Sequence, residues 1–110
     1  MHYKVTVTEQ AFEDLDNIIG YLLFRFNNTQ AASGVLDDFD QTTAMLADCA
    51  GSLKLCENPS LKSLGYRRIN FRRHDYFMLY RLEGDTAVVD GMLPVKQRVK
   101  KNKLYQLWVG

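Results

Sequence analysis

The chain has few cysteines and no long apolar run, the features that cross-link small proteins or anchor them in membranes. It has only two cysteines, Cys49 and Cys56, with no second pair and no neighbouring histidine, which argues against a zinc site or a disulfide scaffold. No apolar run approaches the roughly 20 residues of a membrane-spanning helix. The opening residues, MHYKVTV, also lack the basic-then-apolar order of a signal peptide. We therefore expect a cytoplasmic protein with reduced thiols, and no metal or cofactor site is predicted.

The remaining composition is typical of one globular domain. Apolar residues make up 46% of the chain and charged residues 25%, close to the average for folded domains. A chain of 110 residues buries roughly two-thirds of the surface that it exposes when unfolded, so one cooperative core is expected. We predict a single domain over residues 1–93 and a basic C-terminal tail over residues 94–110.

Charge is distributed unevenly along the chain, although the net charge is only +1. Residues 1–60 contain three basic and nine acidic residues, a net charge of −6. Residues 61–110 contain eleven basic and four acidic residues, a net charge of +7. The second half therefore suits an acidic partner, either nucleic acid or an acidic protein segment.

The first half of the chain begins with a strand and continues as a helix. Residues 3–7 alternate between apolar and polar types, as in a half-buried strand. Thr8 then has the character of a helix N-cap, and apolar residues recur at three- and four-residue steps over residues 8–26. The apolar face of this first helix consists of Phe12, Leu15, Ile19, Leu22 and Phe26.

A second helix is predicted over residues 29–49, capped by Thr29 and ended by Gly51. Its apolar face consists of Ala32, Val35 or Leu36, Phe39, Thr43 and Leu46. The break at Asn27 and Asn28 is so short that the two helices should form an antiparallel hairpin. Four aspartates should then face solvent, namely Asp37, Asp38, Asp40 and Asp48.

The second half of the chain is predicted to form a sheet. Residues 51–63 lose the helical period, and Pro59 argues against regular structure there. Strands are predicted over 66–71, 76–83 and 86–93. A tight hairpin at Gly84 and Asp85 joins the last two strands. The fold class is therefore α+β with the order β-α-α-β-β-β, in which a helical hairpin packs on a small, mainly antiparallel sheet that the first strand joins at an edge.

The basic residues of the sheet are the strongest candidates for a functional surface. Arg67, Arg68, Arg72 and Arg73 interleave with aromatic residues, a mixture that suits phosphate contact and base stacking. Strand alternation sends neighbouring arginines to opposite faces, so only some can share a patch. His74, in the predicted turn, is a candidate for proton transfer or simply an exposed turn residue.

Four phrases of the sequence follow one another in a characteristic order. The capping phrase over residues 7–15, VTEQAFEDL, is followed by Ile18-Ile19-Gly20-Tyr21. The second helix opens with an Asn and paired alanines over residues 28–32, NTQAA. In the sheet, residues 64–69, LGYRRI, precede residues 79–82, LYRL. In this order the phrases resemble the RelE/ParE superfamily of bacterial type II toxin–antitoxin systems, and the opening of the second helix resembles ParE-like members. The resemblance covers residues 3–93 and implies the fold described above.

The resemblance implies two alternative activities. RelE-like members cut messenger RNA on the ribosome with basic residues of the sheet and the C-terminal segment, and the candidates here are Arg68, Arg72, Arg81 and Tyr105. Asn70 and Phe77 occupy positions where further basic residues would be expected, and the segment after Leu93 has no histidine. ParE-like members instead inhibit DNA gyrase by binding it and need no catalytic residues, which favours this second activity.

The resemblance also implies partners. These are a cognate antitoxin, with which the chain would form a hetero-oligomer, and either DNA gyrase or the ribosome with its message as target. The residues predicted to bind nucleic acid or a partner are Arg67, Arg73, Tyr76, Lys96, Arg98, Lys100 and Lys101. A third possibility is an inactive binding module that has retained only its antitoxin surface.

Overall fold

The computed structural model describes residues 2–95, and residue 1 and residues 96–110 lie outside its description. The elements follow one another as β1 (Lys4–Val7), α1 (Glu9–Gly20), the π-helical turn η1 (Tyr21–Arg25), α2 (Thr29–Cys49), the 3-10 turn η2 (Ala50–Ser52), α3 (Pro59–Ser63), β2 (Arg67–Asn70), β3 (Tyr76–Glu83) and β4 (Thr86–Pro94). The predicted α+β class and element order are confirmed, apart from the added α3 and the two short helical turns.

The four strands form one mixed sheet in the order β1-β4-β3-β2. β1 lies at one edge and pairs with β4 in parallel, whereas β2 with β3 and β3 with β4 are antiparallel. The register shifts between Leu79 and Tyr80, because Leu79 pairs with Gly91 but Tyr80 pairs with Val89. Asp90 is therefore the extra residue of a β-bulge, and its side chain lies on the same face as that of Arg81.

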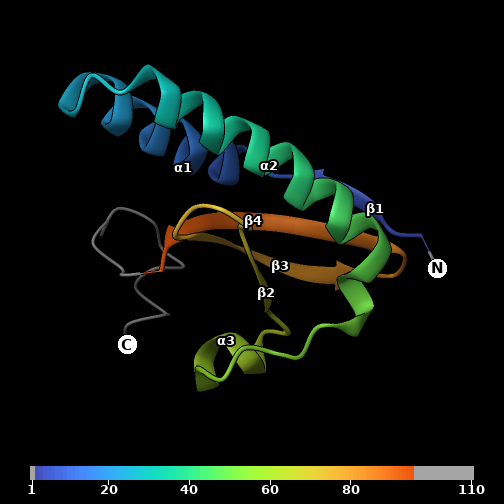
Figure 1. Cartoon of the computed structure of the whole chain (residues 1–110). Helices are drawn as coiled ribbons and strands as arrows, with labels where there is room; N and C mark the ends of the chain where they lie inside the picture. Colours follow the sequence, from blue (N-terminus) through green and yellow to red (C-terminus); the bar gives the residue numbers. More distant parts are fainter. Residues whose placement is uncertain (1, 96–110) are drawn as a thin grey trace.

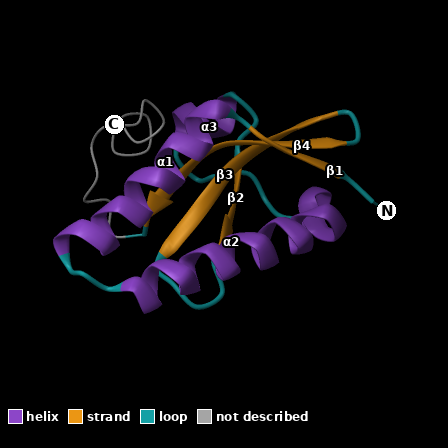
Figure 2. Cartoon of the chain, turned by 90° about the horizontal axis from the view of Figure 1, so that it is seen from above, coloured by secondary structure: helices purple, strands orange, loops and turns teal. Residues whose placement is uncertain are grey.

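The helical hairpin covers one face of the sheet. Figure 1 shows α1 and α2 above the strands and α3 below them, and Figure 2 shows the two long helices meeting at their tip and separating toward their other ends. The Thr8 hydroxyl caps α1 by accepting from the Ala11 N–H at 3.3 Å. α2 is capped by the Asn28 side chain, which accepts from the Ala31 N–H at 2.9 Å. The prediction of Thr29 as the cap was thus wrong by one residue.

The main core lies between the helical hairpin and the sheet. Leu15 and Ile18 of α1 and Leu46 of α2 pack with Met78 and Tyr80 of β3. On α2 it is Val35 that is buried, whereas Leu36 is 44% exposed. Phe12 and Phe26, which were assigned to the apolar face of the first helix, are 48% and 58% exposed. The hairpin therefore keeps apolar surface on its outer side and at its tip.

A smaller core lies on the opposite face of the sheet, between the sheet and α3. It joins Leu61 and Tyr66 to Phe77 and Leu79 of β3. The prediction that residues 51–63 lack regular structure was wrong, because Pro59 stands at the first position of α3, where its missing N–H costs nothing. The Asn58 side chain caps this helix by accepting from the N–H groups of Ser60 and Leu61 at 3.0 and 3.2 Å.

Candidate functional site

The sheet separates the predicted arginines into distinct places. Arg67 lies on the hairpin side of β2 and donates to the Leu53 carbonyl, whereas Arg68 lies on the opposite face over the Phe77 ring. Arg81 of β3 shares that face with Arg68, and Arg72 and Arg73 lie in the turn between β2 and β3. Five further predicted residues lie outside the described part of the chain, namely Lys96, Arg98, Lys100, Lys101 and Tyr105.

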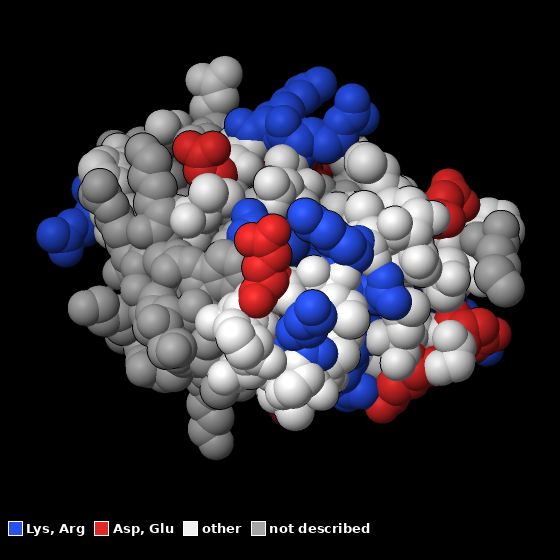
Figure 3. Space-filling view, turned by 90° about the horizontal axis from the view of Figure 1, so that it is seen from below, with Lys and Arg blue, Asp and Glu red and all other residues white. Residues whose placement is uncertain are grey.

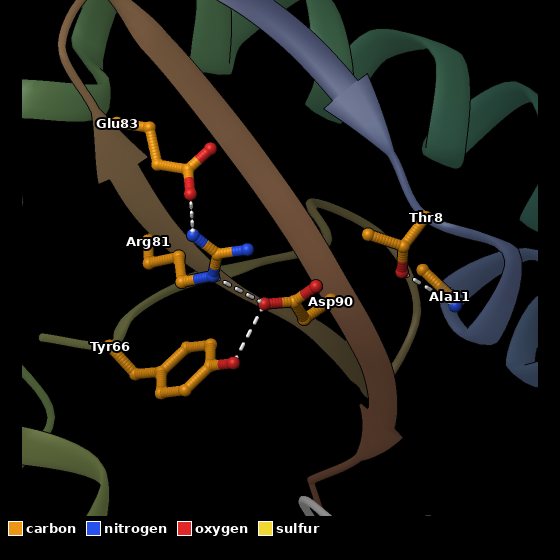
Figure 4. Close-up of polar contacts among 6 residues, drawn as sticks. All are labelled: Thr8, Ala11, Tyr66, Arg81, Glu83 and Asp90. Atoms are coloured by element: carbon orange, nitrogen blue, oxygen red, sulfur yellow. Dashed lines mark hydrogen bonds and ion pairs between the residues drawn. The ribbon is translucent and has the colours of Figure 1, made fainter. Parts of the chain in front are cut away.

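Four polar residues, here called the Arg81 cluster, meet on the face opposite the helical hairpin: Tyr66, Arg81, Glu83 and Asp90. The Arg81 Nε donates to Asp90 Oδ2 at 2.9 Å, and its Nη1 forms an ion pair with Glu83. The Tyr66 hydroxyl donates to the same Asp90 oxygen at 2.7 Å. Figure 4 shows the guanidinium between the two carboxylates. Alternation along β4 places Asp90 on the same face as Val88, which pairs with Arg81.

The cluster holds its protons firmly. Burial raises the pKa of Tyr66, and the hydrogen bond to Asp90 and the charge of Asp90 raise it further, to about 12. Hydrogen bonds to Glu83 and Asp90 raise the pKa of the Arg81 guanidinium above its ordinary value. Near neutral pH, Tyr66 is therefore a neutral phenol and Arg81 a cation whose charge is balanced locally. Neither group is suited to accept a proton from a nucleophile.

Arg68 occupies a second position on the same face. Its guanidinium carbon lies 3.9 Å from the centroid of the Phe77 ring, and its Nε and Nη2 donate to the Asn70 side-chain oxygen at 3.1 and 2.9 Å. It also lines a groove of about 430 Å³ between the segment 53–57 and β2. Burial raises the pKa of the Cys56 thiol in this groove, although the charge of Arg68 opposes the effect. The groove thus offers two cations, Arg68 and Lys54, of which Lys54 is paired with Glu57 at 3.5 Å, and no thiolate at neutral pH.

Tyr76, a predicted partner-binding residue, does not belong to this face. It packs against the main core and makes an edge contact with Phe71, with ring centroids 6.1 Å apart. Burial raises the pKa of its phenol, and Tyr21 at the end of α1 adds to the increase. Tyr76 therefore lies on the hairpin side of the sheet, against the main core.

The turn between β2 and β3 is held by a carboxylate of α2. Asp38 Oδ1 accepts from the Arg72 N–H at 3.0 Å, and Oδ2 accepts from the Arg73 N–H at 2.9 Å and contacts His74 Nδ1 at 2.8 Å. Residues 72–74 are here called the arginine turn. The prediction that Asp38 faces solvent was wrong, because the residue is 2% exposed. Its three neighbours in that prediction, Asp37, Asp40 and Asp48, are exposed as expected.

His74 lies against α2 rather than in solvent. Its imidazole sits over Gly34, where a Cβ atom would lie 3.2 Å from the ring. Burial on its own would raise the pKa of the Asp38 carboxyl, but hydrogen bonds from His74, Arg73 and Arg72 outweigh it and lower the pKa below the ordinary value. Asp38 is therefore an ionised anchor, and His74 is placed to hold the turn rather than to act on the sheet face.

Sequence analysis missed Asp38 and Asp90, which organise these two sites. Asp90 did leave a signal, since it is the one charged residue in the run over 87–93, AVVDGML, and a glycine follows it. A charge followed by glycine inside an apolar strand is typical of a bulge. Asp38 left none, because its partners lie 34 to 36 residues away in the sequence.

The face opposite the helical hairpin is rich in cations. Figure 3 shows Lys and Arg side chains gathered over this side, with a few Asp and Glu side chains among them. Among residues 2–95, no group of three or more His, Cys, Asp or Glu side chains could hold a metal ion. No helix in that part of the chain is long and apolar enough to cross a membrane.

Similarity to a known family covers almost the whole of the helical hairpin and the sheet. The family model described as "ParE toxin of type II toxin-antitoxin system, parDE" matches residues 5–93. The chain therefore belongs to the ParE toxin family, within the RelE/ParE superfamily.

Solved structures agree in fold. The chromosomal ParDE toxin–antitoxin system of P. aeruginosa has a TM-score of 0.65 at 20% identity, covering 80% of this chain and 90% of that one. The toxin–antitoxin complex RelBE2 of Mycobacterium tuberculosis has a TM-score of 0.53 at 20% identity, covering 84% and 96%. Among curated protein sequences, none matches the chain. At this identity the two structures establish the fold, and the family match establishes the class of toxin.

Proposed function

We propose that this toxin arrests bacterial growth by binding DNA gyrase in the cytoplasm and does not itself cleave RNA. The observation that carries the proposal is the pairing of Arg81 with both Asp90 and Glu83. A cation that served RNA cleavage would have to face the phosphate. Here the guanidinium of β3 faces two carboxylates, which would repel that phosphate.

The chemistry of RNA cleavage supports the same conclusion. Attack by a 2′-hydroxyl needs a base, cations for the charge that develops on phosphorus, and an acid for the leaving oxygen. On the described sheet face, Tyr66 has a pKa of about 12 and keeps its proton near neutral pH, and Arg81 is balanced by carboxylates. Loss of one preorganised donor commonly slows such a reaction by about a hundred- to a thousandfold. A toxin that acts by binding avoids these requirements.

Ribosome-dependent cleavage of messenger RNA is the second candidate, and Arg68 is the observation that favours it. Its side chain contacts the Phe77 ring and the Asn70 amide oxygen, and neither group carries a charge that would repel phosphate. Arg72 lies in the turn at the end of β2 and would have to move to join Arg68. The predicted contribution of Tyr105 concerns a residue outside the described part of the chain.

The deciding experiment compares both targets with one protein preparation. Purified toxin is added to a gyrase supercoiling reaction and, in parallel, to ribosomes translating a defined message. We expect supercoiling to be inhibited and the message to stay intact, and Arg68→Ala to change neither result. Site-specific cuts that Arg68→Ala abolishes, with supercoiling unaffected, would make the chain an endoribonuclease.

Induction of the toxin alone in bacteria provides the control for activity as such. Growth arrest that co-expression of the cognate antitoxin relieves is the expected outcome. The likeness to two toxin–antitoxin systems supports such a partner, which would form a hetero-oligomer with the chain. No arrest at any expression level would instead identify an inactive binding module.

A further inference from the structure

The arginine turn presents two cations whose backbone is fixed from behind. The N–H groups of Arg72 and Arg73 point at the Asp38 carboxylate, and the Asp38 side chain is 1% exposed. Both arginine side chains are exposed, and neither forms an ion pair with a carboxylate within residues 2–95. Two guanidiniums are therefore held outward with their charge available to a partner.

The arginine turn is held by contacts with one face of α2. Gly34 and Asp38 lie one helical turn apart, so they share a face of the helix. The glycine leaves room for the His74 ring, and the carboxylate binds that ring and the two N–H groups before it. In Figure 2 the loop that joins β2 to β3 runs beside α2. Such a fixed backbone reduces the conformational entropy that a partner must remove on binding.

The surroundings of the turn favour a protein partner over nucleic acid. The turn contacts the N-terminal half of α2 at Gly34 and Asp38. The tip of the helical hairpin, from which α2 starts, exposes aromatic side chains: Tyr21 is 52%, Phe24 89% and Phe26 58% exposed. Asp37 and Asp75, next to the anchor and the turn, are exposed carboxylates. A continuous phosphate backbone would be repelled by them, whereas a peptide can place separate carboxylates on the two arginines and apolar side chains on the tip.

We propose that Asp38 is a positioning residue that holds Arg72 and Arg73 to bind an acidic, amphipathic segment of the antitoxin. The proposal rests on the toxin–antitoxin function given above, but not on the choice of gyrase as target. It assigns the arginine turn and the aromatic tip to one binding surface, distinct from the Arg81 cluster on the sheet face. Arginine and exposed aromatic residues together are typical of the centres of protein interfaces.

The test measures binding of a fluorescein-labelled peptide by fluorescence anisotropy. The peptide has leucines at the three- and four-residue steps of an amphipathic helix and glutamates between them, and a second peptide has glutamines in place of the glutamates. We expect the double variant Arg72→Gln/Arg73→Gln to bind the acidic peptide about three- to tenfold more weakly, since exposed ion pairs contribute modestly. Lys4→Gln/Lys62→Gln, which removes the same charge from exposed sites elsewhere, should bind almost as the wild type does.

Asp38→Asn separates positioning from simple charge attraction. This variant makes the protein more positive, so attraction alone would tighten binding of the acidic peptide. Loss of the anchor should instead weaken binding about threefold or more, and the effect should vanish in the Arg72→Gln/Arg73→Gln background. A variant that merely destabilised the fold would weaken binding in both backgrounds. Thermal unfolding of each protein verifies that it is folded at the temperature of the measurement.

His74→Ala provides a second variant if Asp38→Asn does not fold. It keeps the carboxylate and both N–H bonds, frees one end of the turn, and should weaken binding by a smaller factor than Asp38→Asn. Unchanged or tighter binding by a folded Asp38→Asn, or equal losses in the lysine control, would overturn the proposal. So would a single-stranded RNA oligonucleotide that binds more tightly than the peptide with the same dependence on Arg72 and Arg73. The supercoiling assay is separate, so failure on gyrase would leave this result intact.

Discussion

Asp90 shows how one residue determines the chemistry of the sheet face. As the extra residue of a β-bulge, it points toward Arg81 and Tyr66 and binds both. The same carboxylate balances a guanidinium and raises the pKa of a phenol. The charge of Arg81 is therefore balanced within the protein, whereas an arginine that binds phosphate must keep its charge available to the phosphate.

The Tyr66 phenol should make stability sensitive to alkaline pH. Its pKa is about 12 in the folded protein against 10.0 as its ordinary value, so the unfolded chain loses this proton first. The stabilisation is therefore complete below pH 10 and is lost as the pH rises from there toward 12. Urea unfolding at several pH values, beside Tyr66→Phe, should show the stability difference between the two proteins shrinking over that interval. A constant difference would contradict the assignment.

The Asn28 cap stabilises the start of α2, where the helical hairpin reverses direction. Asn28 accepts from the Ala31 N–H and follows Asn27, which has a φ of 47°, a conformation that asparagine tolerates better than most residues. Asn28→Ala should lower the free energy of unfolding by about 1 kcal/mol. Thr29→Ala, the matched control at the next position, should stay within about 0.5 kcal/mol of the wild type. Equal losses in urea titrations of the two variants would mean that the cap is wrongly placed.

At the scale of elements, local signals in the sequence were sufficient for most of the fold. The periods of the two long helices and the three C-terminal strands set their bounds to within a few residues, because apolar spacing reports local geometry directly. Pro59 was misread because proline is unfavourable inside a helix but favourable at its first position, so its presence alone does not exclude a helix that begins there. Proline indicates a boundary, and only its neighbours decide which side is helical.

The site was less predictable than the fold for a physical reason. Arg68 and Arg81 could be assigned to the sheet from alternation, but whether a guanidinium is free depends on what faces it across strands. Asp38 reads as one of several surface aspartates. Its burial depends on donors from a turn more than thirty residues away. Long-range pairing of this kind has no local period to reveal it.

At the scale of the molecule, the sheet carries a core on each face, and the two should respond differently to truncation. Leu46 and Leu61 are both fully buried, the first under the helical hairpin and the second in α3. Leu46→Ala should lower the free energy of unfolding by about 2 to 5 kcal/mol. Leu61→Ala should instead open α3 locally, because five residues can detach without separating the strands.

Hydrogen exchange followed by mass spectrometry distinguishes these two responses. Leu61→Ala should speed exchange over residues 53–66 while β3 and β4 stay protected, and Leu46→Ala should raise exchange in all elements together. If Leu61→Ala also exposed β3 and β4 to exchange, the two cores would form a single cooperative unit.

The parallel pairing of β1 with β4 affects how the protein can fold while it is synthesised. The strand made first finds its partner only when residues 86–89 exist, so the sheet cannot be completed element by element as the chain is synthesised. Contacts between residues far apart in the sequence are slow to form, because the entropy cost of closing a long loop comes before the favourable energy of the contact. Until almost the whole domain has been translated, the nascent chain lacks the assembled sheet. A toxin with this topology therefore acquires its finished surface only late in its synthesis.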